Sequence, residues 1–206
     1  IKKNGFAISS QTDNLVPIDK VIYALRDITG TTESIPLIAV SVMSKKIACG
    51  AKNILIDLKL GRGALIKNKK DAMELSKLMV KIGKFYNRNV KTEITDMNNP
   101  LGYTIGNALE VIEAKEVLEN KNKSYFRDFC INIAAEMVSI GRNTPLKIAK
   151  KEVIEALDSG KAYEKFLNMI KDQGGDISTL KVSSKKQYIL SIKSGTIKNI
   201  DALKFG

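Results

Sequence analysis

The possible folds of this chain are limited most by a pair of short aliphatic runs on either side of one amphipathic segment. Asn53 to Lys59 (NILIDLK) is too short for a typical helix and is followed by the glycine loop Gly61 to Gly63, which indicates a buried strand. Asp71 to Tyr86 carries apolar residues at the spacing of a helix face, and Val90 to Thr95 is again strand-like. A strand, a helix and a second strand in this order predict an α/β fold.

Proline and glycine positions and apolar spacing predict further helices on both sides of this unit. They cover Pro17 to Asp27, Ile35 to Ala48, Ile105 to Leu118, Phe126 to Ile140, a stretch that begins at Thr144-Pro145, and Lys161 to Lys171. Residues 5 to 9 predict a short strand, and Val182 to Ile200 is strand-like. Because the chain starts with Ile and stops soon after that stretch, we expect it to be part of a longer protein.

The composition limits the chemistry. The 206 residues are 44% hydrophobic, and no apolar run approaches the roughly 20 residues of a membrane-spanning helix, so we expect a soluble globular protein. The absence of histidine excludes Cys/His zinc sites and Ser-His or Cys-His catalytic pairs. Cys49 and Cys130 are expected to be reduced thiols in the core of a cytosolic protein.

The net charge of +12 would attract phosphates, nucleotides or nucleic acid. The basic residues are mostly lysines, however, and clusters such as Lys67 to Lys70 and Lys185-Lys186 lack the interleaved aromatic residues of single-strand binders. Nucleic-acid binding is therefore not expected. A basic nucleotide- or nucleic-acid-binding module without catalysis stays open as the alternative function.

One polar pattern is compatible with base recognition. Ser41 and Lys45 stand four residues apart, so their side chains share one helix face. Together with Arg26 they could complement a ring edge that presents an acceptor, an N–H and an acceptor, as a pyrimidine does. The simpler interpretation, a solvated rim of polar residues, stays open from the pattern alone.

A series of ordered motifs resembles the pyrimidine-nucleoside and thymidine phosphorylases. The motifs are Ser10 to Lys20 (SQTDNLVPIDK), Tyr23 to Thr29 (YALRDIT), Glu33 to Ile38 (ESIPLI) with Ser41 and Lys45-Lys46, Asp57 to Lys59 (DLK), Gly61 to Ala64 (GRGA), Thr95 to Met97 (TDM), Pro100 to Gly102 (PLG) and Gly106 to Val111 (GNALEV). The resemblance implies a cytoplasmic pentosyltransferase of nucleoside salvage. The implied reaction would be reversible phosphorolysis of a pyrimidine nucleoside to the free base and a pentose 1-phosphate, with inorganic phosphate as co-substrate and no organic cofactor. An anthranilate-type phosphoribosyltransferase would share the architecture but would not be expected to carry the pattern from Tyr23 to Lys45.

The resemblance also implies roles for individual residues. Arg26 and Lys45 would donate to the base oxygens and stabilise the negative charge on the departing base, and Ser41 would meet the ring N–H. In the remaining positions Tyr23, Ile38 and Leu65 would line the base pocket, and Asp19 would orient the basic groups. For Tyr23 and Ile38, ordinary helix packing stays open. The carbonyl groups of Leu101 and Thr104, with the carboxylate of Glu113, would form a site for K⁺ or Ca²⁺.

The same resemblance predicts the domain organisation. Residues 1–16 would be a strand and hinge crossing, 17–49 part of a helical lobe for base binding and dimerisation, 50–173 a central α/β domain, and 174–206 a linker and the start of a carboxyl-terminal domain. The family's upstream glycine-rich phosphate loop is not found in this sequence. We therefore expect no phosphorolytic activity of this chain alone. The resemblance also implies that the longer protein is a homodimer.

Overall fold

The computed structural model describes residues 1–8, 10 and 12–205, and its centre is a parallel pair of strands. β1 (Asn53–Leu60) and β2 (Asn89–Asp96) pair from Asn53 opposite Asn89 to Leu60 opposite Asp96. Parallel strands need a crossover connection, and α3 (Lys69–Phe85) supplies it. The predicted strand, helix and strand are confirmed, and so is the α/β class.

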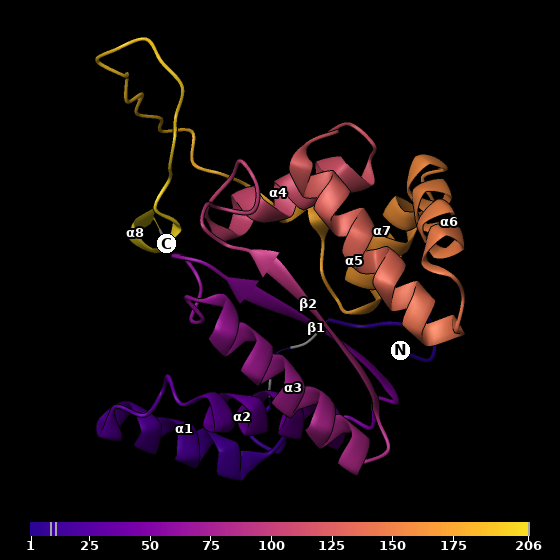
Figure 1. Cartoon of the computed structure of the whole chain (residues 1–206). Coiled ribbons are helices and arrows are strands. Elements are labelled where there is room, and N and C mark those ends of the chain that lie inside the picture. The colour runs from indigo at the N-terminus through magenta and orange to yellow at the C-terminus, as the bar shows by residue number, and fades with distance from the viewer. Residues whose placement is uncertain (9, 11, 206) are drawn as a thin grey trace.

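The other helices surround this unit (Figure 1). In chain order they are α1 (Pro17–Thr29), α2 (Ile35–Ala48), α4 (Asn107–Leu118), α5 (Tyr125–Arg142), α6 (Leu146–Asp158), α7 (Lys161–Asp172), the short 3₁₀ turn η1 (Ile177–Thr179) and α8 (Ala202–Phe205). α3 packs against α2 and both strands, whereas α5 contacts β1 and α6. None of the helices in the described part of the chain is long and apolar enough for a membrane crossing.

The main hydrophobic core lies between α2, β1 and α3. Its fully buried side chains include Met43 of α2 and Met79 of α3, whose flexible thioethers fill the space between the two helices. The other buried members are Ile38, Ala39, Ile54, Leu58, Ile66, Ala72 and Leu75. This core fixes α2 against the strands, and α1 in turn packs on α2.

Three expectations from the sequence are wrong. Residues 5–8 form no strand, and Ser9, the last residue of that prediction, lies outside the described residues. Val182 to Ile200 likewise contains no strand, because it runs through solvent and pairs with neither strand of the sheet. Cys49 is a free thiol but is exposed at the end of α2 instead of lying in the core; Cys130 is also free and is half-buried.

Candidate active site

The packing of α1 on α2 brings three polar side chains together. Asp19 lies in the first turn of α1, and Ser41 and Lys45 lie one turn apart on α2. Ser41 Oγ donates to Asp19 Oδ2 at 3.1 Å, and Lys45 Nζ forms an ion pair with the same oxygen. Asp19, Ser41 and Lys45 are called the Asp19 cluster below. The shared face predicted for Ser41 and Lys45 is confirmed, since Lys45 Nζ lies 3.1 Å from Ser41 Oγ.

The Asp19 cluster is largely removed from solvent. Asp19 and Ser41 are 8% and 7% exposed. A buried carboxylate needs hydrogen-bond donors or a cation, and both are present. The three donors of the Lys45 ammonium are shared between the Asp19 carboxylate and the hydroxyl and carbonyl oxygens of Ser41. A ligand that accepts from Lys45 would therefore replace a contact to Ser41, while Asp19 keeps the ammonium in place.

Arg26, in the last turn of α1, is even more buried, at 3% exposure. Its Nε donates to the carbonyl of Thr31 at 3.4 Å and its Nη2 to the carbonyl of Thr32, so the guanidinium holds the loop between α1 and α2. The same group lies 5.0 Å from the centre of the Tyr23 ring, in a cation–π contact. Arg26 and Tyr23 thus form a second small unit on the helix that carries Asp19.

A cavity of about 510 Å³ opens beside these residues. Of the side chains predicted to bind a base, Asp19, Tyr23 and Lys45 line it; the other lining residues are Thr12, Asp13, Lys20, Ala24 and Asp27. Ile38 points instead into the core, and Leu65 lines a different cavity. The structure therefore places Asp19, Tyr23 and Lys45 at this cavity. Arg26 and Ser41 lie on the same two helices but do not line it, Ile38 of α2 packs in the core, and Leu65 belongs to the loop after β1.

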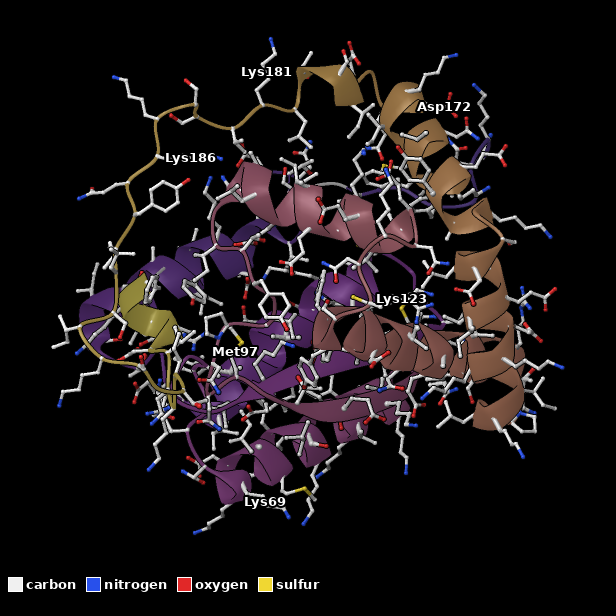
Figure 2. All side chains as sticks on the ribbon, turned by 90° about the horizontal axis from the view of Figure 1, so that it is seen from above. Lys69, Met97, Lys123, Asp172, Lys181 and Lys186 are labelled. Atoms are coloured by element: carbon white, nitrogen blue, oxygen red, sulfur yellow. The ribbon has the colours of Figure 1, made fainter. Side chains whose placement is uncertain are left out.

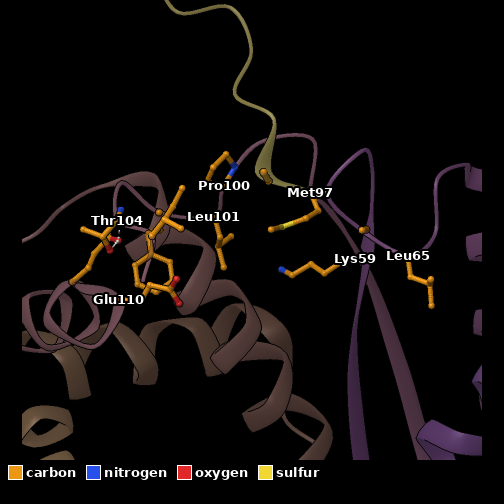
Figure 3. A pocket seen from close by; sticks show the side chains of 14 residues that line it. Lys59, Leu65, Met97, Pro100, Leu101, Thr104 and Glu110 are labelled. Carbon is orange, nitrogen blue, oxygen red and sulfur yellow. Dashed lines mark hydrogen bonds between the residues drawn. The ribbon is translucent and has the colours of Figure 1, made fainter. Parts of the chain in front are cut away.

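The second cavity, of about 570 Å³, lies between the loops that follow β1 and β2 (Figure 3). This is the carboxyl end of the parallel pair, where α/β proteins commonly bind ligands. Leu65 comes from the first loop and Met97 from the second, while Lys59 extends from β1 toward the cavity. The three residues predicted to hold a cation, Leu101, Thr104 and Glu113, also line this cavity.

Glu113 is buried in α4 and ties down the loop after β2. Its Oε1 accepts from the backbone N–H of Tyr103 at 2.9 Å, and its Oε2 accepts from the N–H and the hydroxyl of Thr104 at 3.1 and 2.6 Å. Burial raises the pKa of this carboxyl, but the hydrogen bonds from the Thr104 hydroxyl and the two amides outweigh it, so the net pKa is lowered. The loop approaches closely because residue 102 is glycine; a Cβ there would overlap the carboxylate.

This arrangement fits the predicted cation site only in part. Glu113 could give a cation one oxygen, because a carboxylate has about four lone-pair positions and three are used here. The donors of Tyr103 and Thr104 already compensate its charge. A role for Leu101, Thr104 and Glu113 in ion binding stays a prediction.

Lys59 lines the second cavity, although it was not predicted as a site residue. Its Nζ lies 2.7 Å from Oδ2 of Asp57, which is on the same face of β1. The same Nζ donates to the hydroxyl of Thr95 at 3.1 Å, and Thr95 is the residue of β2 paired with Lys59. The Thr95 hydroxyl in turn donates to Asp57, and the Lys59 ammonium lies 4.2 Å from the centre of the Phe129 ring. The alternation of Asp57 and Lys59 along a strand was visible in the sequence, but the pairing with Thr95 depends on register.

Comparisons with known proteins agree with the motifs. A family model described as "Glycosyl transferase family, a/b domain" matches residues 1–163. The chain is 44% identical over 186 residues to a protein called pyrimidine-nucleoside phosphorylase from Bacillus subtilis (strain 168), and 48% identical over 177 residues to one of the same name from Staphylococcus aureus (strain bovine RF122 / ET3-1). These matches cover 90% and 85% of this chain but 43% and 41% of the relatives. The predicted resemblance is confirmed, and the chain spans about two fifths of the length of these curated relatives.

Proposed function

Because this chain belongs to the glycosyl transferase family defined by that a/b domain, we propose that it takes part in the reversible phosphorolysis of pyrimidine nucleosides. Inorganic phosphate would attack the anomeric carbon as the bond to the base breaks, giving a free pyrimidine and a pentose 1-phosphate. The observation that carries this proposal is the Asp19 cluster at the edge of a cavity, with an ammonium and a hydroxyl held side by side. Identity of 44% to a pyrimidine-nucleoside phosphorylase supports the choice of substrate.

The chemistry follows from the charge on the leaving group. The base departs with its bonding electron pair, so a cation next to a base oxygen stabilises the transition state more than the neutral nucleoside. Lys45 would supply this charge while Asp19 orients the ammonium. The Ser41 hydroxyl would accept a hydrogen bond from the ring N–H. Arg26 would act at the other base oxygen, held by the loop between α1 and α2. This chain would thus carry the base-recognition half of the site.

The proposed enzyme is a homodimer that works in nucleoside salvage in the cytoplasm. An apolar stripe on α1 supports the dimer. Ile18, Val21, Leu25 and Ile28 follow helical spacing along one face and are between 56% and 83% exposed. Sedimentation equilibrium tests this proposal: Val21→Lys with Leu25→Lys is expected to give a monomer, whereas an unchanged association state would reject α1 as the contact.

The decisive experiment measures phosphate-dependent release of uracil and thymine from their nucleosides. The assayed protein is this chain joined to an upstream segment with the family's phosphate-binding loop, taken from the Bacillus subtilis relative. Lys45→Ala and Arg26→Ala are each expected to lower kcat/KM at least about 100-fold. Lys46→Ala is the matched control, since Lys46 is the neighbouring lysine of α2 but is exposed. Equal activity of the Lys45→Ala and Lys46→Ala proteins would remove Lys45 from the site.

Calorimetry on the chain as it stands separates the proposal from the nucleic-acid alternative. We expect uracil to bind to the Lys45→Ala protein about tenfold more weakly, the effect of losing one hydrogen bond from a charged group. Uracil binding itself should depend little on salt. Single-stranded DNA binding that weakens steeply as salt rises, without uracil binding, would instead favour a basic nucleic-acid-binding module.

The cation prediction has its own test. If K⁺ or Ca²⁺ binds at Leu101, Thr104 and Glu113, either ion should raise the melting temperature relative to Na⁺ at equal ionic strength, because a ligand that binds only the folded state stabilises it. The Glu113→Gln protein should lose this increment. Identical melting in all three salts would reject the site.

A further inference from the structure

The last part of the chain returns to the second cavity after a long excursion. Residues 180–198, called the strap here, contain no helix or strand and run mostly through solvent; Ile189 and Ile192 are 93% and 96% exposed. Figure 1 shows the strap leaving the helical side of the molecule and ending at α8, and Figure 2 shows Lys181 and Lys186 spaced along it. The strap therefore connects the helical side of the molecule to α8 with little packing of its own.

The segment that follows, residues 199–205, docks on both loops of the second cavity. Arg62 of the first loop donates through Nη2 to Asn199 Oδ1 at 3.0 Å, and the backbone N–H of Ile200 donates to Asn99 Oδ1 of the second loop at 3.1 Å. Ala202 forms part of the cavity wall. In Figure 3 this segment descends beside Pro100 and Met97, over the space toward which Lys59 extends.

The docking place is shaped for a close approach. A Cβ added at Gly63 would lie 2.9 Å from the Cβ of Ala202 and 2.9 Å from the carbonyl oxygen of Met97. Gly63 also donates its N–H to that carbonyl at 2.8 Å, which joins the two loops under the docked segment. Arg62 links all three segments, since its backbone N–H and its guanidinium both bond Asn98 of the second loop.

The docking is weak compared with the core. The hydrogen bonds of Asn199 and Ile200 are solvent-accessible, and the side chains of Leu203 and Phe205 remain 68% exposed, so little apolar surface is buried. Segments with few buried contacts open at a small fraction of the global unfolding free energy. By contrast, the loops beneath are fixed by backbone hydrogen bonds such as Met97 N–H to the Leu60 carbonyl at 2.8 Å.

We propose that residues 199–205 form a latch over the second cavity, and that its opening and closing on the strap controls access to that cavity. In the closed state Ala202 forms part of the wall. In the open state the hydrogen bonds of Asn199 and Ile200 would break while the loops keep their shape. The proposal does not depend on the reaction proposed above, because it concerns only how solvent and small molecules reach the cavity.

Thiol labelling tests the latch without any substrate. Ala64→Cys places a thiol in the cavity wall, where Ala64 is 9% exposed, and the native Cys49 is an exposed reference outside the cavity. Labelling with N-ethylmaleimide is followed at each cysteine by peptide mass spectrometry. In this background Asn199→Ala and Asn99→Ala are each expected to raise the labelling rate at position 64 about fivefold, the effect of losing one exposed hydrogen bond. Gln187→Ala, an exposed polar-to-alanine change within the strap, is the matched control and should leave the rate unchanged.

Hydrogen exchange supplies the second readout. The Ile200 amide donates to Asn99, so Asn99→Ala should abolish its protection, and Gln187→Ala should not. The latch is rejected if labelling at position 64 is equally fast in all variants. It is also rejected if Asn199→Ala speeds labelling at Cys130 as much as at position 64, since that pattern reports loosening of the whole α/β unit.

Discussion

Replacing Glu113 by Gln should show how much the buried carboxylate in the wall of the second cavity contributes to the free energy of unfolding. The substitution keeps the shape of the side chain but removes its charge and turns one oxygen into an N–H₂ donor. Glu113 accepts one hydrogen bond at Oε1 and two at Oε2. In the most favourable orientation the amide oxygen keeps both bonds from Thr104, and the amide nitrogen then faces the N–H of Tyr103.

The cost can be worked out from these contacts. The unsatisfied N–H of Tyr103 costs about 1–3 kcal/mol, and each bond to Thr104 loses about 1 kcal/mol when its acceptor becomes neutral. Glutamine is uncharged, so the variant avoids the cost of burying a charge, which offsets part of this loss. We expect Glu113→Gln to lower the free energy of unfolding by about 2–3 kcal/mol at pH 7, which moves a urea midpoint by about 1 M.

The pH dependence gives a sharper test. Because the pKa of Glu113 is lowered in the folded state, the carboxylate contributes stability that is fully present above its ordinary value of 4.5 and is lost as the pH falls through the folded pKa. The difference between the wild-type and Glu113→Gln proteins should therefore shrink below pH 4.5. Other carboxylates titrate in both proteins and cancel in the difference.

Urea unfolding followed by circular dichroism at several pH values from 7 to about 3 measures this difference. Glu110→Gln is the matched control, since Glu110 lies one turn earlier on α4 and accepts a single bond, from the Gly106 N–H at 3.0 Å, near the surface. It should cost less than about 1 kcal/mol. A loss of unfolding free energy below about 0.5 kcal/mol for Glu113→Gln at pH 7, or one that stays constant as the pH falls to about 3, would contradict this role of Glu113.

Three further predictions concern the scaffold. Gly83→Ala should lower the free energy of unfolding by about 1–3 kcal/mol, because the new Cβ would overlap Val90 Cγ2. The double variant with Val90→Ala should lose less stability than the two single variants added together, and an additive double-mutant cycle would contradict the overlap. Leu58→Ala should cost about 2–5 kcal/mol in urea unfolding, since Leu58 is 4% exposed; a cost below 1 kcal/mol would contradict its place in the core. The hydrogen bond from Lys115 lowers the pKa of Glu119 to about 2, so the stabilisation from Glu119 should be complete above pH 4.5 and disappear between about pH 4.5 and 2. A carboxyl NMR titration should show a higher pKa of Glu119 in the Lys115→Ala protein, and an unchanged value would contradict the pairing.

The secondary structure was predictable because its signals are local. The strand at Asn53, the helix after Asp71 and the strand at Val90 each follow from periodicity within a few residues, and the structure confirms all three. The strand predicted for Val182 to Ile200 failed for the complementary reason. A strand is stabilised by its neighbour, and the described residues offer this segment no partner strand.

The candidate site divides in the same way. Helical spacing alone predicted that Ser41 and Lys45 share a face, and the contact between them confirms it. The bond from Ser41 to Asp19 spans 22 residues of sequence and depends on how α1 packs on α2. The aliphatic runs and helix faces were thus determined by the sequence itself, through short-range sterics and hydrophobic periodicity.

Which polar groups meet depends on how elements far apart in the sequence pack together. The register of β1 against β2 places Thr95 opposite Lys59, and the close approach at Gly102 lets the loop after β2 surround the carboxylate of Glu113. The return of Ala202 to Gly63 joins parts of the chain separated by more than a hundred residues. The contacts of Thr95 and Glu113 depend on the packing of whole elements, because the entropy lost in closing a long loop is recovered only when many groups are buried together.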